Sequence, residues 1–156
     1  MLKVKAHRQE PGCCGPACLK MVLHYYGIEK TEKELMKLTA CRPARGTSAE
    51  SIVEAAKKIG FDAFFQDFCE LKDVRKFLQK KVPVIVAWFS QDDGHYSVVV
   101  KMDEEDIYLQ DPELKKIRKV DLVTFKRIWF DFPGDFLKTK ENIVIRRMIV
   151  IEPTEA

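Results

Sequence analysis

The order of the apolar patterns constrains the fold of this 156-residue chain more than any other feature. Apolar residues at helical spacing dominate the first part of the chain, and β-rich runs dominate the later part. Helices that precede a set of strands are typical of an α+β domain, in which N-terminal helices pack on a C-terminal antiparallel sheet. Because 46% of the residues are apolar, the chain can bury a core of its own, and we expect one domain over residues 1–156.

Three helices are expected before most of the strands. The first begins at Cys14 and ends before Gly27, where a glycine can close the last turn. Residues 31–34 and residues 47–50 both resemble capping boxes, and the second would open a helix that ends at Gly60. The remaining elements are predicted strands at residues 61–65, 84–89, 95–101, 107–111, 117–120 and 143–151, and predicted helices at residues 70–80 and 121–129.

The first helix carries the strongest chemical signal, because it opens with the sequence Cys-Cys-Gly-Pro-Ala-Cys at residues 13–18. The free amides and the positive dipole end of a helix favour a thiolate over a neutral thiol. Cys14 is therefore a candidate nucleophile. An isolated cysteine in this position is more often buried and unreactive, so the assignment depends on finding a partner elsewhere in the chain.

Two polar residues at strand ends, His95 and Asp111, are the candidate partners. If the chain turns back in a three-residue loop between residues 101 and 105, Val99 lies opposite Ile107 and His95 opposite Asp111. A one-residue error in this register would put the two side chains on opposite faces of the sheet. A carboxylate beside an imidazole holds one ring nitrogen protonated and leaves the other to act on a thiol.

Cys14, His95 and Asp111 together supply the parts of a thiol hydrolase, and here the chain resembles a known family. It is similar to the papain-like cysteine peptidases that process bacteriocin precursors after a double-glycine leader, often as domains of ABC exporters. The resemblance extends from about residue 7 to at least residue 130. The motifs that carry it are Gln9 upstream of Cys14-Gly-Pro-Ala, Tyr25-Tyr-Gly27, Gly46-Thr-Ser48, His95, and Asp111-Pro112.

The resemblance implies a papain-like fold, hydrolysis of a peptide bond after a small residue, and no cofactor or metal. It implies that Cys14 is the nucleophile, that His95 is the general base and later acid, and that Asp111 orients His95. Gln9 would donate a hydrogen bond to the oxyanion, with the Cys14 backbone amide as the second donor. Gln9 lies one residue closer to the nucleophile than is usual in the family. The expected partners are a peptide or protein substrate, such as a double-glycine leader peptide, and an ABC exporter.

Charge and cysteine content bear on location and partners. The net charge is +3, with 27 basic and 24 acidic residues interspersed, which argues against a dedicated nucleic-acid surface. Five cysteines are an odd number, and the N-terminus lacks the apolar core of a secretion signal, so we expect a reducing cytoplasm. No apolar run approaches the length that crosses a bilayer.

Two alternatives remain open. A catalytically silent module of the same fold would bind a leader peptide without cutting it. A thiol-based redox or zinc protein would use Cys13, Cys14 and Cys18, with His7 or His24 as further zinc ligands. The basic run Lys115, Lys116, Arg118 and Lys119 is interpreted as a solvated strand edge.

Overall fold

The structure is a computed structural model that describes residues 1–43, 46–90 and 93–154, with the backbone alone for Asp93. Its helices are α1 (Cys14–Tyr25), α2 (Glu32–Leu38), α3 (Ala49–Ile59), α4 (Leu71–Gln79), α5 (Leu122–Ile128) and the short 3-10 helix η1 (Lys140–Asn142). Its strands are β1 (Phe61–Gln66), β2 (Val84–Ser90), β3 (Asp93–Met102), β4 (Asp106–Asp111), β5 (Lys116–Asp121), β6 (Phe130–Asp131), β7 (Val144–Ile145) and β8 (Arg147–Pro153).

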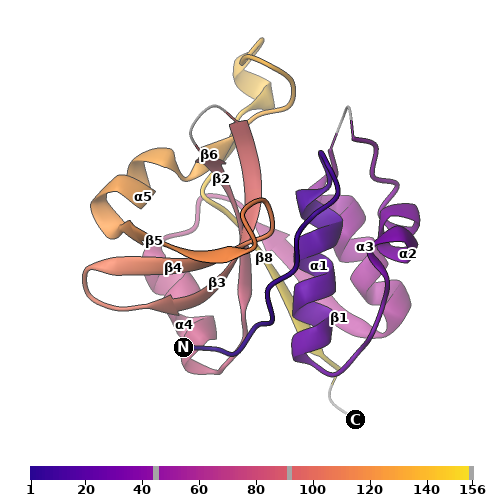
Figure 1. Ribbon diagram of the computed structural model, residues 1–156. Helices are drawn as coiled ribbons and strands as arrows, with labels where there is room; N and C mark the ends of the chain where they lie inside the picture. Colours follow the sequence, from indigo (N-terminus) through magenta and orange to yellow (C-terminus); the bar gives the residue numbers. More distant parts are fainter. Residues whose placement is uncertain (44–45, 91–92, 155–156) are drawn as a thin grey trace.

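Six strands form one antiparallel sheet in the order β1-β8-β2-β3-β4-β5, and β6 pairs separately with β7. Helices α1, α2 and α3 gather on one side of this sheet, while α4 and α5 lie on the other (Figure 1). The α+β prediction is confirmed, although helices cover both faces of the sheet.

The central strand β2 explains why both faces are covered, because nearly all of its side chains are buried. Ile85 and Ala87 join the core beneath α1 and α3. Val84, Val86 and Trp88 point the other way, into a second core that α4 and α5 close. A strand that is apolar on both faces requires cover on both sides.

Most helix boundaries agree with the predictions. Helix α1 begins at Cys14 and ends at Tyr25, and the Thr31 side chain caps α2 by accepting a hydrogen bond from the amide of Glu34 at 3.1 Å. The capping box predicted at residues 47–50 is wrong by one residue. Ser48, not Thr47, caps α3, and its hydroxyl accepts from the amide of Ser51.

The strand predicted over residues 143–151 is wrong in its continuity. Arg146, with φ +46°, interrupts it and separates β7 from β8. A non-glycine residue in this left-handed region cannot continue an extended strand. The short strand β6, which pairs with β7, was not predicted.

The hairpin of β3 and β4 contains a bulge that the sequence pattern did not reveal. Next to the turn, Lys101 pairs with Tyr108 and Met102 with Ile107, but beyond the bulge Val99 pairs with Leu109. The predicted pairing of Val99 with Ile107 is therefore wrong by two residues. Because side chains alternate along a strand, an error of two residues leaves the side chains beyond the bulge, from Val99 back to His95, on their predicted face.

Candidate active site

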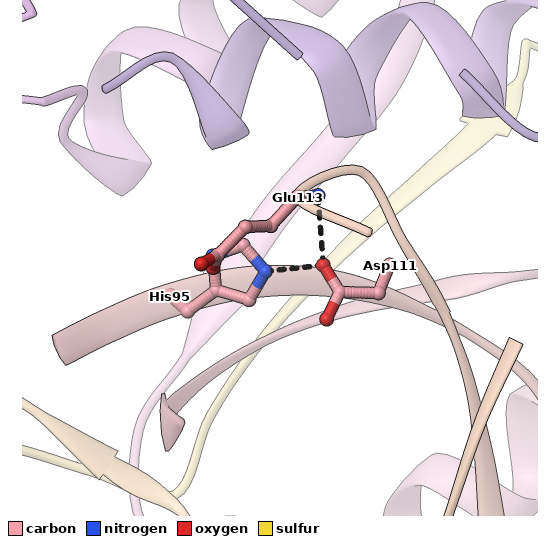
Figure 2. A group of neighbouring side chains, drawn as sticks. All are labelled: His95, Asp111 and Glu113. Carbon is pink, nitrogen blue, oxygen red and sulfur yellow. Dashed lines mark hydrogen bonds and ion pairs between the residues drawn. The ribbon is translucent and has the colours of Figure 1, made fainter. Parts of the chain in front are cut away.

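A buried pair of His95 and Asp111 lies at the adjoining ends of β3 and β4 (Figure 2). His95 Nε2 lies 2.5 Å from Asp111 Oδ1, and the two side chains are 4% and 0% exposed. Continuing the observed register puts Asp111 opposite Ser97, so its contact with His95 is diagonal rather than direct. Without the bulge, the register next to the turn would leave His95 and Asp111 on opposite faces.

Both oxygens of the Asp111 carboxylate accept hydrogen bonds from groups other than the His95 imidazole. Oδ1 also accepts a hydrogen bond from the backbone amide of Glu113 at 2.9 Å. Oδ2 accepts from Arg118 Nη1 at 3.0 Å, and the same nitrogen donates to the Ser90 hydroxyl at 2.7 Å. A buried carboxylate with this many partners is fixed in position and stays ionised.

The Trp88 ring is the apolar neighbour of this network. It lies 6.1 Å from the His95 ring in an edge-on arrangement and 5.0 Å from the guanidinium carbon of Arg118. The indole nitrogen donates to the Ser97 hydroxyl at 3.0 Å. Trp88 therefore covers one side of the His95–Asp111 pair with apolar surface, while its own indole nitrogen has a hydrogen-bond acceptor.

Cys14 is the first residue of α1, and Cys13 is its N-cap residue. The Cys14 sulfur is half-buried and accepts a hydrogen bond from the backbone amide of Tyr96, the residue after His95, at 3.4 Å. This contact brings the start of α1 to the end of β3 that carries the histidine. Because Asp111 takes up Nε2 of His95, Nδ1 is the ring nitrogen left for the thiol.

The charges of the site favour a protonated imidazole. Burial alone lowers the pKa of His95, but hydrogen bonding and charge interactions with Asp111 and Cys14 outweigh it and raise that pKa to about 10. Burial likewise opposes ionisation of Asp111, yet hydrogen bonds from His95, Arg118 and the Glu113 amide hold the pKa of that carboxyl below its usual value. At neutral pH His95 therefore carries a positive charge and Asp111 a negative one.

Gln9 lies against the end of β4, where its backbone amide donates to the carbonyl of Pro112 at 2.9 Å. A turn in which the Cys13 amide donates to the Glu10 carbonyl, with Gly12 at φ +75°, spans the short distance from Gln9 to Cys14. The side-chain oxygen of Gln9 is buried and has no hydrogen-bond partner among the described residues. That unpaired oxygen can accept a hydrogen bond from a ligand, whereas only the amide nitrogen of the same side chain can donate one.

The segment that carries Gln9 is held by Glu32, the first residue of α2. Its carboxylate lies 2.5 Å from His7 Nε2 and accepts a hydrogen bond from the Glu10 amide at 2.6 Å. Arg8 adds a hydrogen bond to the carbonyl of Glu113 at 3.2 Å. Contacts on both sides of Gln9 thus fix its backbone.

The sequence model of the family described as "Peptidase C39 family" matches residues 3–132. The chain belongs to the peptidase C39 family. Its members are papain-like cysteine peptidases, which agrees with the resemblance drawn from the motifs around Cys14, His95 and Asp111.

Several C39 relatives are similar in sequence. The Lactococcin-G-processing and transport ATP-binding protein LagD of Lactococcus lactis subsp. lactis is 32% identical over 133 residues, which cover 82% of this chain and 18% of LagD. An uncharacterized protein of Methanothermobacter thermautotrophicus is 36% identical over 124 residues, which cover 80% of this chain and 79% of that protein. The chain thus spans less than a fifth of LagD.

Two solved structures of C39 peptidases share the fold. The peptidase domain of Streptococcus ComA, a bi-functional ABC transporter involved in quorum sensing, superposes with a TM-score of 0.77 at 24% identity, covering 97% of this chain and 100% of that domain. A double glycine motif protease from an AMS/PCAT transporter, in complex with the leader peptide, gives a TM-score of 0.75 at 23% identity, covering 98% and 94%. Within the described ranges of our chain, every helix is too short or too polar to span a bilayer.

Three of the residues named for a zinc alternative are engaged elsewhere in this C39 fold. Cys13 contacts Cys41, His7 contacts Glu32, and Cys18 is fully buried in the core. Among the described residues, His95, Asp111 and Glu113 do come close enough to hold a cation. However, Asp111 lies at Nε2 and Glu113 Oε2 lies 3.6 Å from Nδ1, so the carboxylates flank opposite nitrogens, which suits an imidazolium better than one metal ion.

Arg118 is the residue of the site that sequence reasoning missed, since its basic run was interpreted as a solvated edge. That interpretation is wrong for Arg118, although Lys116 and Lys119 are exposed. The turn after Asp111 pairs that residue with Lys116 and pairs Leu109 with Arg118. Lys116 lies opposite Asp111, and side chains two residues apart on a strand share a face. This alternation would have predicted that Arg118 lies on the same face of the sheet as Asp111.

Proposed function

We propose that this chain is an active cysteine peptidase that cleaves a peptide after a double-glycine leader. Cys14 is the nucleophile, His95 the acid–base group, Asp111 the residue that orients His95, and Gln9 an oxyanion donor. The observation that carries the proposal is the buried His95–Asp111 pair facing a half-buried thiol at a helix start. No metal or organic cofactor takes part in this chemistry.

His95 is protonated in the resting state at neutral pH, because its pKa is about 10. The reacting form of Cys14 is the thiolate. The Cys14 sulfur attacks the scissile carbonyl carbon and the carbonyl electrons move onto oxygen. When the tetrahedral intermediate collapses, the bond to nitrogen breaks and His95 delivers its proton to the leaving amine. The product is a thioester between Cys14 and the leader peptide.

Water completes the cycle. Neutral His95 takes a proton from a water molecule, whose oxygen attacks the thioester carbonyl and displaces the Cys14 thiolate. Throughout, Asp111 holds Nε2 of the ring and stabilises its positive charge, and Arg118 keeps Asp111 ionised and in position. Arg118 touches no reacting atom and is a positioning residue.

The oxyanion needs two donors. Backbone amides in the first turn of α1 lack helical acceptors, so the Cys14 amide can serve as one donor. The Gln9 amide nitrogen, Nε2, supplies the other, because backbone contacts with Pro112 and through the following turn hold Gln9 between the end of β4 and the start of α1. The contacts of Glu32 and Pro112 with the neighbouring backbone reduce the entropy lost on fixing this donor.

The substrate and partner follow from the relatives. LagD is named for processing and transport of lactococcin G, and one matching structure contains a leader peptide bound to a double glycine motif protease. We therefore propose a double-glycine leader peptide as substrate and an ABC exporter as partner, with the peptidase working in the cytoplasm.

Cleavage of a synthetic double-glycine leader peptide, followed by mass spectrometry, tests the proposal. Cys14→Ala should lower kcat/KM by at least roughly 10⁴-fold and should abolish rapid labelling by iodoacetamide at near-neutral pH. Cys41→Ser, which removes a partly exposed thiol outside the catalytic group, is the matched control and should cleave normally. Binding of the intact peptide without any cleavage by the wild-type chain would establish the leader-binding module instead.

A further inference from the structure

Two thiols outside the catalytic group meet beside the nucleophile. The sulfur atoms of Cys13 and Cys41 lie 2.9 Å apart, although the residues are 28 positions apart in the chain. Cys13 is fully buried, whereas Cys41 is partly exposed. A disulfide requires about 2.05 Å between the sulfurs, so a closure of about 0.9 Å would join them.

The segments that carry these thiols are in contact independently of sulfur. The carbonyl oxygen of Pro43 lies 2.5 Å from the position that a Cβ of Gly12 would occupy, so the two backbones touch there. The Cys41 amide donates to the Met36 carbonyl at the end of α2, and Arg42 pairs with Gly46 across the following loop. Both sulfurs are thus attached to backbone that is already fixed at short range.

The other three cysteines are engaged elsewhere. Cys14 accepts the Tyr96 amide and interacts with His95. Cys18 is fully buried within the core beneath α1. Cys69 belongs to the second core, where its thiol donates to the Gln66 carbonyl at 3.2 Å. Cys13 with Cys41 is therefore the one cysteine pair in sulfur-to-sulfur contact among the five described thiols.

We propose that Cys13 and Cys41 are a modification site that forms a reversible disulfide, which fastens the segment after α2 to the N-cap of the catalytic helix. The bond would leave Cys14 free, because the Cys13 side chain points to Cys41 and the Cys14 side chain to His95 and Tyr96. This inference goes beyond the proposed peptidase activity and does not depend on it.

The oxidant is a low-molecular-weight disulfide such as oxidised glutathione. The more exposed Cys41 attacks it as the thiolate, forms a mixed disulfide and releases one glutathione thiol. Cys13 then loses its proton and displaces the second glutathione, which leaves one protein disulfide and two reduced thiols. Burial and the neighbouring Cys41 raise the pKa of Cys13 to about 12, so we expect this second step to be slow and faster at alkaline pH.

Peptide mapping of the native protein tests the site. The chain is treated with excess oxidised glutathione, free thiols are blocked with iodoacetamide, and trypsin then releases residues 9–20 and residues 38–45 as separate peptides. We expect these two peptides to be linked in wild type, in Cys14→Ser and in the matched control Cys69→Ser. We expect no link in Cys41→Ser or in Cys13→Ala. Because each variant removes one partner of the disulfide, the test still holds if one of them fails to fold.

Thermal unfolding gives a second readout. A disulfide that closes this loop should raise the Tm of oxidised wild type by roughly 5–10 °C, and a reducing agent should reverse the change. Cys41→Ser should show no such shift. Free Cys13 and Cys41 after oxidation of the native protein, or a link that disappears in Cys14→Ser, would overturn the proposal, whether or not the protein cleaves a peptide.

Discussion

In the sheet half of the site, formed by His95, Asp111 and Arg118, side chains hold one another in place. In the helix half, formed by Cys14 and Gln9, the backbone carries the side chains into position. The sheet half contains charged hydrogen bonds of 2.5 to 3.0 Å among buried groups. The helix half depends on a turn, a helix start and the amide contact of Tyr96 with the Cys14 sulfur.

This difference separates what each half controls. Charged side chains that contact His95 set its protonation, so changes in the sheet half should move the pH dependence of cleavage. Backbone contacts set the position of the sulfur and of the oxyanion donor, so changes in the helix half should mainly lower the rate and should move that pH dependence less, through the contact of Cys14 with His95 alone. Three substitutions test this division, and the first has the largest expected effect.

Asp111→Asn should lower kcat/KM by roughly 10²-fold, because the amide still accepts a hydrogen bond from the ring but no longer stabilises its charge. In wild type, cleavage should fall at alkaline pH as His95 loses its proton near its pKa of about 10. Loss of the carboxylate charge lowers that pKa, so the alkaline limb of the kcat/KM profile should move to lower pH. An unchanged limb would contradict the role of Asp111.

Glu113→Gln is the matched control for that substitution. The Glu113 carboxylate also lies near the imidazole, 3.6 Å from Nδ1, but its side chain is 55% exposed. Solvent screens an exposed charge, so kcat/KM should stay within about threefold of wild type.

Arg118→Met should lower kcat/KM by about tenfold and the free energy of unfolding by about 2 kcal/mol, because buried Asp111 loses a charged partner. Activity at pH 7 and urea unfolding measure the two effects. Lys119→Met removes a neighbouring charge on the same strand, where Lys119 makes only an exposed ion pair of 3.6 Å with Asp106. That control should change stability by less than about 0.5 kcal/mol, and equal losses in both variants would argue against a specific role for Arg118.

Gly12→Ala tests the helix half and should have the smallest effect on activity. The new Cβ would meet the Pro43 carbonyl oxygen, and the residue already has φ +75°, so we expect a loss of about 2–3 kcal/mol in unfolding free energy. Gly27 has a similar φ of +86° with open space around it, and Gly27→Ala should lose about 1 kcal/mol.

Activity of Gly12→Ala should fall a few-fold as the turn before Cys14 shifts, with a smaller movement of the alkaline limb than Asp111→Asn gives. A shift of that limb equal to the one expected for Asp111→Asn would show that the two halves are not separable. Equal stability losses for the two glycine variants would show that the contact with Pro43 does not contribute to the loss in Gly12→Ala.

Local patterns predicted much of this molecule because the physical causes are local. The helix start at Cys14, the Thr31 cap and the apolar strand β2 depend on residues within a few positions of one another. The sequence also predicted that Cys14, His95 and Asp111 lie close together, and the structure brings them together.

The arrangement within the site was less predictable, because it depends on contacts between distant segments. No local pattern around Val100 announces the bulge, and the basic residues around Arg118 do not show which of them turns inward. The partner of Cys13 was equally hidden, since Cys41 reaches it only through the packing of α2 beside α1.

The bulge at Val100 divides the hairpin into a part that tolerates changes of length and a part that does not. Between the bulge and the tip, insertions and deletions in the turn at residues 103–105 can be absorbed, because that stretch carries no residue of the site. Deleting Val100 alone would reverse the faces of every side chain from Val99 back to His95 relative to β4. Insertions and deletions should therefore be tolerated at the tip of this hairpin but not at its base.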